Sequence, residues 1–453
     1  MVPERPQELL TAGSAPASAG ALSLQGRIDA AGLRAIQTGV VALCALVTLV
    51  EGIDLTLIPL LAPAIAASWS LQPAALGIIF STGAFGLIFG GLGIGWLADR
   101  IGRRGALLSA MVLMTLATLA TAWVSTVPQL LVCRLLAGVA FGGVIPAAVA
   151  LVSEFTPQRT RPSVVALVIL GQAAGALLAA LLLKLPFAAG RPWQTLVLWT
   201  GLTCAAVTLV ILLLLPESPR YLALREPAGR RLARTLAALR IEPSAAVVEP
   251  EPAARGFRLA ELFAPGRAYG TALLWATFIG VGWPLSFFTN WLTKIYTQAG
   301  HAAQVGVDAM AFYSAGAMAG GLVLPLFSRR WHHDRVLMAS ILAAAIVTAG
   351  LGSVLALGAS VHMTASFLCG VFVSGSFFML YPPAVRFYPT DIRSTGIGAA
   401  VAFGRVGNTL SPTVAGLMLG AGVAPATVFW SMAAPLLMSC TALYLFHRHT
   451  AGR

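Results

Sequence analysis

The chain has 453 residues, of which 58% are hydrophobic and only 10% are charged, and its formal net charge is +13. Soluble domains carry about 25% charged residues, so this composition excludes a water-soluble fold and places most of the chain in lipid. The positive charges stand in short clusters between apolar segments, a pattern that excludes a nucleic-acid-binding surface. These properties predict a protein that crosses a membrane many times.

The first half of the chain begins with a polar tail, residues 1–37, that has no apolar core of a signal peptide. A bundle of six spanning helices is predicted to follow in residues 38–215, because each span needs about 20 apolar residues. The predicted spans lie near 38–66, 75–98, 105–125, 128–152, 163–185 and 194–215.

The first predicted span carries two acidic residues, Glu51 and Asp54. Three-residue spacing places both carboxylates on one flank of a helix. Because two acids so close together in low dielectric cannot both be ionised easily, at least one is expected to hold a proton. We therefore predict that Asp54 and Glu51 couple the protein to protons, with a structural pair neutralised by an arginine as the alternative.

The fourth span carries Arg134 near the end that follows the third span, where its side chain could reach the bilayer surface or bind a substrate. The next long polar stretch, residues 216–267, is a central loop with an Arg-rich helical segment from Arg220 to about Leu239 and a Pro- and Glu-rich linker, 243–254. This loop separates the two halves of the chain.

The second half, residues 268–446, is predicted to form another six-helix bundle, followed by a short tail, 447–453. Arg405 lies deep within its fifth span, where a charge is costly and indicates function. Its planar guanidinium suits a carboxylate, so we expect it to bind an acidic substrate. In the empty protein we expect it to pair with a carboxylate such as Asp54 or Glu51. The six spans lie near 268–292, 306–328, 335–357, 361–386, 394–420 and 425–446.

Amide and aromatic side chains of the second half could complete a pocket around Arg405. Each could also simply pack in the core or against lipid. The candidates are Asn290, Trp291, Phe287, Phe288, Tyr381 and Asn408.

A metal site or cofactor is not expected. The five cysteines lie within apolar segments, the six histidines are assigned to loops or tails, and His332–His333 has no accompanying ligand cluster. No nucleophile–base pair or phosphate-binding loop indicates an enzyme.

The placement of Lys and Arg predicts the orientation. With the N-terminus in the cytoplasm, nearly all basic residues fall in cytoplasmic loops and tails, and only Lys184, Arg191 and Lys294 fall outside. Both termini are therefore predicted to be cytoplasmic.

The two halves of the sequence also align at one constant offset, which pairs Gly138 with Gly370 and Gly175 with Gly407. Two related halves suit a carrier whose site lies between them near the bilayer midplane.

The loop between the second and third spans reads Gly95-Trp96-Leu97-Ala98-Asp99-Arg100-Ile101-Gly102-Arg103-Arg104, which resembles the signature of the major facilitator superfamily. The resemblance implies an all-α membrane protein of twelve transmembrane helices in two pseudo-symmetric bundles. In that family the loop latches the cytoplasmic side, so Gly95, Asp99, Arg100, Gly102, Arg103 and Arg104 are expected to form a cytoplasmic gate. The equivalent second-half segment, residues 328–335, lacks the acid at its expected position, which predicts a stronger latch in the first half.

Two further segments narrow the resemblance. Glu51-Gly52-Ile53-Asp54 is similar to the first-helix signature of the aromatic acid:proton symporters, and Gly404-Arg405-Val406-Gly407 is similar to their eleventh-helix pattern. The resemblance implies a monomeric carrier of the bacterial inner membrane that takes up an aromatic or other small carboxylate with protons by alternating access. Arg405, Arg134, Asn290, Tyr381 and Asn408 are the expected substrate-binding residues. A sugar or organic-ion porter, and a drug or metabolite efflux antiporter, are the alternatives; a membrane sensor has no supporting feature.

Overall fold

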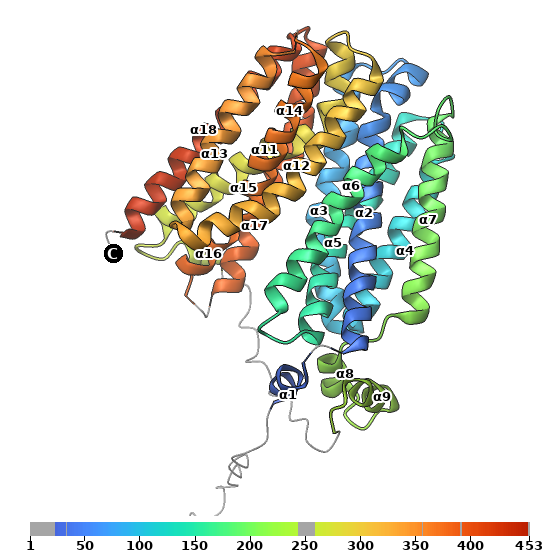
Figure 1. Ribbon diagram of the computed structural model, residues 1–453, viewed down its shortest axis with the longest axis vertical. Helices are drawn as coiled ribbons and strands as arrows, with labels where there is room; N and C mark the ends of the chain where they lie inside the picture. The colour runs from blue at the N-terminus through green and yellow to red at the C-terminus, as the bar shows by residue number, and fades with distance from the viewer. Residues whose placement is uncertain (1–22, 33, 243–258, 356, 390–391, 452–453) are drawn as a thin grey trace, which may run out of the picture.

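The computed structural model describes residues 23–32, 34–242, 259–355, 357–389 and 392–451, and within them it is a bundle of long helices (Figure 1). All twelve predicted spans are present as helices of this bundle, as the fold class requires. Those of the first half are α2 (Ala35–Trp69), α3 (Pro73–Ile101), α4 (Arg103–Thr121), α5 (Val127–Phe155), α6 (Arg161–Leu182) and α7 (Trp193–Leu214). Those of the second half are α11 (Ala268–Gln298), α12 (Ala303–Arg330), α13 (His333–Ser353), the broken helix α14 to α16, α17 (Arg393–Gly420) and α18 (Pro425–Ala451).

The tenth span is interrupted where the chain cannot keep a regular helix. It consists of α14 (Ala359–Cys369), a π-helical turn (Gly370–Ser374), α15 (Gly375–Phe378) and α16 (Tyr381–Phe387). Pro382 and Pro383 lack the amide hydrogens that would continue α15 into α16. The break brings Tyr381 to the start of a new helical segment, α16.

Four short helices lie outside the spans: α1 (Leu24–Ala31), α8 (Pro219–Arg225), α9 (Arg230–Leu239) and α10 (Leu259–Leu262). The N-terminal tail is therefore partly helical, and α1 is held in place because the Asp29 carboxylate accepts a hydrogen bond from the Gln158 backbone N–H at 2.8 Å. The Arg-rich segment that was predicted as one helix is two helices. The predicted linker 243–254 lies outside the described residues.

Equivalent glycines make equivalent contacts in the two halves. A Cβ on Gly138 would lie 2.1 Å from the Gly83 carbonyl oxygen of α3, and one on Gly370 would lie 2.0 Å from the Tyr313 oxygen of α12. Because only glycine lets two helix backbones approach so closely, the α5–α3 contact of the first half is repeated by the contact of the tenth span with α12. The internal repeat predicted from the sequence is thus a repeat of packing.

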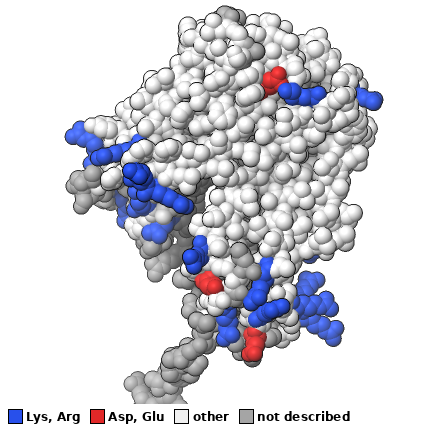
Figure 2. Space-filling model, viewed as in Figure 1, with Lys and Arg blue, Asp and Glu red and all other residues white. Residues whose placement is uncertain are grey.

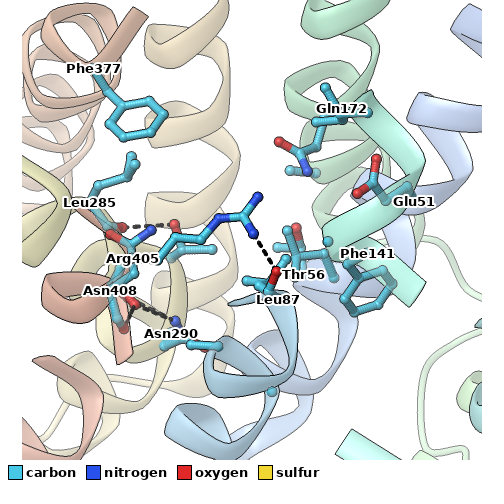
Figure 3. Close-up of a pocket in the computed structure, with 18 of the residues that line it drawn as sticks. Glu51, Thr56, Leu87, Phe141, Gln172, Leu285, Asn290, Phe377, Arg405 and Asn408 are labelled. Carbon is cyan, nitrogen blue, oxygen red and sulfur yellow. Dashed lines mark hydrogen bonds between the residues drawn. The ribbon is translucent and has the colours of Figure 1, made fainter. Parts of the chain in front are cut away.

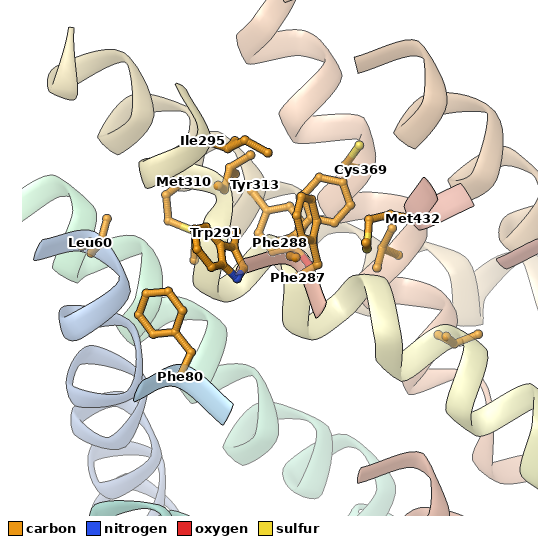
Figure 4. Close-up of a cluster of buried hydrophobic side chains, with 14 of the residues drawn as sticks. Leu60, Phe80, Phe287, Phe288, Trp291, Ile295, Met310, Tyr313, Cys369 and Met432 are labelled. Carbon is orange, nitrogen blue, oxygen red and sulfur yellow. The ribbon is translucent and has the colours of Figure 1, made fainter. Parts of the chain in front are cut away.

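The two halves meet mainly along three helix pairs, α2 with α11, α3 with α17 and α6 with α12, and α2 makes a smaller contact with α12. They diverge towards the end of the molecule that carries α1, α8 and α9 (Figure 1). At the opposite end their apolar side chains interlock: Phe80 of α3 packs edge-on against Trp291 of α11 with ring centroids 5.5 Å apart, and Leu60 and Met310 lie beside them (Figure 4).

Eleven helices of the described chain are long and apolar enough to cross a membrane, with the broken tenth span counted as one. The twelfth, α17, carries Arg405 and is covered by α3 and α11. Lys and Arg gather at the bottom of the view, around α8 and α9, and at its left edge, near the end of α18, and the broad body of the bundle above them is almost free of charge (Figures 1 and 2). This distribution fits a bundle that is buried in lipid at its middle.

Candidate functional site

A cavity of about 630 Å³ lies between the two halves. Its walls come from α2, α3, α5 and α6 on one side and from α11, α12, the broken tenth span and α17 on the other. Of the residues predicted to bind substrate or protons, all but Asp54 line it: Glu51, Arg134, Asn290, Tyr381, Arg405 and Asn408.

Arg405 reaches across the cavity from α17 to the other half. Its Nη1 donates a hydrogen bond to the backbone carbonyl of Leu87 in α3, and Gly91 leaves room for the guanidinium, since a Cβ there would lie 2.4 Å from Nη1 (Figure 3). The expected direct pairing of Arg405 with Asp54 or Glu51 is absent from this conformation, although Arg405 and Glu51 interact electrostatically across the cavity. A backbone carbonyl, which is a neutral acceptor, takes the place of the carboxylate.

Glu51 is fully buried at the cavity wall. Neither of its carboxylate oxygens has a hydrogen-bond partner among the described residues. Burying an ionised carboxylate without a partner is costly, so this environment favours the neutral, protonated form. Gln172 of α6 projects into the cavity beside Glu51 (Figure 3).

Asp54 points elsewhere, into the first half. The Thr118 hydroxyl of α4 donates a hydrogen bond to its carboxylate, and Thr121, one turn further along α4, accepts a bond of 3.0 Å from Arg134 Nη2. Arg134 and Asp54 interact electrostatically, and both are buried. The alternative that Arg134 reaches the bilayer surface is wrong, because its side chain is held inside the bundle and lines the cavity. Glu51 and Asp54 lie three residues apart on α2 but in different surroundings: Glu51 lines the cavity, whereas Asp54 is bonded within the first half.

The predicted amides lie as expected. Asn290 donates from Nδ2 to the Ser286 carbonyl at 2.8 Å, and the Asn408 Oδ1 atom has no partner among the described residues. The other aromatic candidates, Phe287, Phe288 and Trp291, do not line the cavity. They are fully buried in the second half, where Trp291 Nε1 donates to the Pro412 carbonyl, so for them the core-packing alternative holds.

Several cavity residues were not predicted. They come from the apolar faces of spans, where one aromatic or hydroxyl residue looks like its neighbours in the sequence. Gln172 is the exception, because an amide within an apolar span is a visible signal. These residues include Phe141, Gln172, Tyr313, Ser314, Phe377 and Phe378.

The predicted gate loop is anchored within the first half. Gly102 has a φ of +91°, which favours glycine, and a Cβ there would lie 2.3 Å from a carboxylate oxygen of Glu217. The same carboxylate accepts the Arg104 backbone amide at 3.0 Å at the start of α4, where an anion stabilises the helix N-terminus. Arg103 Nε pairs with Glu154 of α5 at 3.0 Å.

The remaining gate residues are more exposed. Asp99 pairs with Arg103 at 3.3 Å but its side chain is 78% exposed, the Arg100 guanidinium lies 3.7 Å over the Trp96 ring, and no side chain lies near Gly95. Among the described residues, the hydrogen bonds, ion pair and ring contact of Asp99 and Arg100 all lie outside the second half. A latching role for this loop therefore stays a prediction about another conformation.

The second half has an acid close to the equivalent position. Asp334, in the first turn of α13, pairs with Arg386 at the end of α16 and with His447 Nδ1 of α18 at 3.2 Å. The expected position itself lacks an acid, as predicted, but Asp334 performs a similar anchoring role within the second half.

No group of three or more potential metal ligands is found among the described residues. The assignment of every histidine to a loop or tail is wrong. His362 is buried within α14, where Nε2 bonds to the Val354 carbonyl, and His447 and His449 are in α18.

Residues 44–385 match the model of the Major Facilitator Superfamily. The chain is 30% identical over 437 residues to the 4-hydroxybenzoate transporter PcaK of Pseudomonas aeruginosa, which covers 94% of this chain and 95% of that protein. It is 34% identical over 410 residues to the 3-(3-hydroxy-phenyl)propionate transporter of Escherichia coli K12, with 89% and 93% covered, and 28% identical to a gallate transporter of Pseudomonas putida, with 92% and 93% covered. The partially occluded, inward-open xylose transporter XylE of E. coli has the same fold, with a TM-score of 0.72 at 15% identity over 90% of this chain and 97% of that one.

Proposed function

The chain belongs to the Major Facilitator Superfamily and is a membrane transporter, not an enzyme, and on that premise we propose that it takes up an aromatic carboxylate together with protons. Its place would be the bacterial inner membrane, with both termini and the short helices α1, α8 and α9 on the cytoplasmic side. That orientation rests on the gathering of Lys and Arg at this end of the molecule.

The observation that carries the proposal is the Arg405 guanidinium in the cavity between the halves. It is held by one backbone carbonyl and by no ion pair among the described residues. A substrate carboxylate is a stronger acceptor for a guanidinium than the neutral Leu87 oxygen and can accept two parallel bonds. Substrate binding would therefore replace the Arg405–Leu87 contact with a charge-assisted one.

The walls of the cavity suit an aromatic ring. Phe141, Phe377, Phe378 and Tyr381 present aromatic faces and edges, while Asn408 offers an unpaired acceptor to a polar substituent. Three of the relatives are named as transporters of 4-hydroxybenzoate, 3-(3-hydroxy-phenyl)propionate and gallate, and each of these compounds is an aromatic carboxylate with at least one hydroxyl group.

Proton coupling is assigned to Glu51 and Asp54. Glu51 is the acid at the cavity wall, and its lack of partners favours protonation when the cavity faces the more acidic side. Asp54 is hydrogen-bonded to Thr118 and interacts electrostatically with Arg134, so its protonation would change the net charge of this buried group of residues. The halves would then rock about the cavity, so that it opens to each side in turn.

Uptake by purified protein in proteoliposomes tests the proposal. Benzoate, 4-hydroxybenzoate, an aliphatic acid, xylose and the uncharged amide of 4-hydroxybenzoate are offered with and without an inward-directed proton gradient. We expect gradient-driven accumulation of the aromatic acids and none of the amide or the sugar. Uptake of xylose, or equal uptake of acid and amide, would overturn the carboxylate assignment; export driven by the gradient would indicate an antiporter.

A further inference from the structure

Gln172 is fixed at the cavity by a close approach of two helix backbones, α6 and α2. A Cβ on Gly52 would lie 2.0 Å from the Gln172 backbone oxygen, and one on Gly175 would lie 1.9 Å from the Leu49 oxygen. The Thr48 hydroxyl also donates to the Val168 carbonyl at 2.6 Å. The α6 backbone therefore rests directly on α2 at Gly52, the residue that follows Glu51.

This contact decides where the Gln172 side chain lies. It projects into the cavity beside the Glu51 carboxyl group, and Arg405 reaches towards both from the other half (Figure 3). Both Glu51 oxygens lack a hydrogen bond among the described residues, and the groups that act on Glu51 electrostatically are Asp54, Arg405 and the Gln172 amide. The amide of Gln172 is the neutral polar group best placed to respond to the charge of Glu51.

An amide can respond in two ways because it carries a donor and an acceptor at one end. Beside an ionised Glu51 its NH₂ group turns to the carboxylate, and its carbonyl oxygen then faces the cavity. Beside a protonated Glu51 its oxygen accepts the carboxyl hydrogen, and the NH₂ group faces the cavity. Rotation about the last side-chain bond interconverts the two states and moves no helix.

We propose that Gln172 is a positioning residue that converts the protonation of Glu51 into a binding site for the substrate carboxylate next to Arg405. With Glu51 protonated, the cavity presents an NH₂ donor as well as the guanidinium. With Glu51 ionised, it presents a carbonyl oxygen that repels a carboxylate. The proton on Glu51 comes from the aqueous side to which the cavity is open, and it travels with the substrate. This inference rests on the proposed function.

Other charged or titratable groups around Glu51 cannot supply this response. Asp54 shares its helix but is bonded to Thr118, Arg134 of α5 is bonded to Thr121, and Arg405 of α17 is bonded to Leu87. Tyr313 of α12 is bonded to Ser374, and Tyr381 of α16 lies on the same side of the cavity as Arg405. Among the α6 residues that line the cavity, Gln172 is the only polar one.

The test compares Gln172→Met, which keeps the length of the side chain and removes the amide, with wild type. Gln158→Met, an exposed glutamine in the loop after α5, is the matched control. The apparent KM for 4-hydroxybenzoate in proteoliposomes is measured from pH 5.5 to pH 8. The wild type and the control should bind more tightly as pH falls. Gln172→Met should raise KM about ten-fold at low pH, the effect of one hydrogen bond to a charged group, and should flatten the pH profile.

A second measurement separates this role from a structural one. Calorimetry of 4-hydroxybenzoate binding in buffers of different ionisation enthalpy counts the protons taken up with the ligand. Wild type should take up protons, and Gln172→Met should take up fewer at an unchanged melting temperature. An unaltered pH profile in Gln172→Met, or unaltered proton uptake, overturns the inference. Failure of wild type to transport any aromatic carboxylate would instead overturn the proposed function.

Discussion

The two ends of the molecule hold the halves together in different ways. At the end remote from α1, α8 and α9, bonds cross between the halves: Thr413 of α17 and Ser81 of α3 share a hydrogen bond of 2.7 Å, and Lys184 pairs with Asp308 of α12 at 2.7 Å. Phe80 and Trp291 pack across the same boundary. This end is a joint of small, apolar and weakly polar contacts.

At the other end each half is bonded to itself. Arg103 and Glu154 tie α4 to α5, and Asp334 with Arg386 ties α13 to α16, but among the described residues no hydrogen bond or ion pair crosses between the halves there. Glycines Gly93 and Gly95 of α3 and Gly398 of α17 have open space beside them. The proposed rocking of the two halves fits this comparison, because the polar anchors lie within each half and only a limited set of contacts joins the halves at one end.

The largest effect on transport is expected from substitutions of Arg405. Its side chain is hydrogen-bonded to α3 between the end where the halves are joined and the end where they diverge. Arg405→Ala removes the only guanidinium that crosses the cavity in the described chain and should abolish carboxylate transport. Arg405→Lys keeps the charge without the planar fork, so the apparent KM should rise several-fold, equivalent to about 1–3 kcal/mol. Initial uptake rates over a range of substrate concentrations measure both. Wild-type kinetics in Arg405→Ala would make the residue structural.

Glu51 lies at the same depth and should control the proton. Glu51→Gln is permanently neutral and keeps the shape, so it should retain substrate exchange between the two sides and lose accumulation driven by a proton gradient. Counterflow and gradient-driven uptake are measured on the same vesicles. Accumulation preserved in Glu51→Gln would shift the coupling role to Asp54.

Asp54→Asn tests the partner acid. It should also abolish gradient-driven uptake, and it removes the charge that balances buried Arg134. A lower melting temperature is therefore expected as well, from a loss on the order of 3 kcal/mol for an uncompensated buried charge. Thermal unfolding of the purified protein in detergent measures it, and Glu51→Gln, with no ion-pair partner, serves as the control that should not show this loss.

At the open end, Asp99 and Glu154 are expected to behave differently. Glu154 is bonded in the present conformation, so Glu154→Gln should lower the melting temperature. Asp99 is mostly exposed, so Asp99→Asn should leave the melting temperature unchanged and slow transport only if the loop meets the second half when this end closes. Wild-type transport by Asp99→Asn would remove the loop from the gate. Ser328→Ala in the second half should have a smaller effect.

The smallest effect is expected at the Lys184–Asp308 pair of the closed end. Partly exposed ion pairs contribute about 0–1 kcal/mol, so Lys184→Ala should shift the balance of conformations only a few-fold, towards opening at this end. Alkylation of a single cysteine introduced at Ser81 reports that opening. The exchange Lys184→Asp with Asp308→Lys should restore the wild-type rate, and a failure to do so would mean that the pair does not join the halves in the membrane.

Composition and periodicity predicted the spans well because lipid imposes a length and an apolarity on every helix that crosses it. The predicted segment near 394–420 coincides closely with α17, and the costly charge of Arg405 pointed correctly to the cavity. Side-chain direction was harder to predict. Phe287 and Phe288 were candidates for the pocket in the sequence, but their side chains lie on the face of α11 that is buried in the core.

Partners that come from distant parts of the chain were not predictable either. Arg405 was expected to find an acid and instead bonds to a backbone carbonyl, which no side-chain pattern records. Gln172 was visible as an amide in an apolar span, yet its neighbour Glu51 became evident only through the contact of Gly52 with α6. The chemistry of the individual groups was readable from the sequence, whereas their pairing required the fold.

The polar composition of α17 also bears on how the protein is made. This helix is not among the eleven that are apolar enough to cross a membrane by themselves, and an arginine at the centre of a helix costs about 2.5–3.5 kcal/mol on insertion. α3 and α11 cover it in the folded protein, and both precede it in synthesis. We expect nascent α17 to leave the translocon only after α3 and α11 are in the membrane and can pack against it. The residue proposed to bind the substrate would therefore also make the insertion of α17 a late step in biogenesis that depends on the order of the helices.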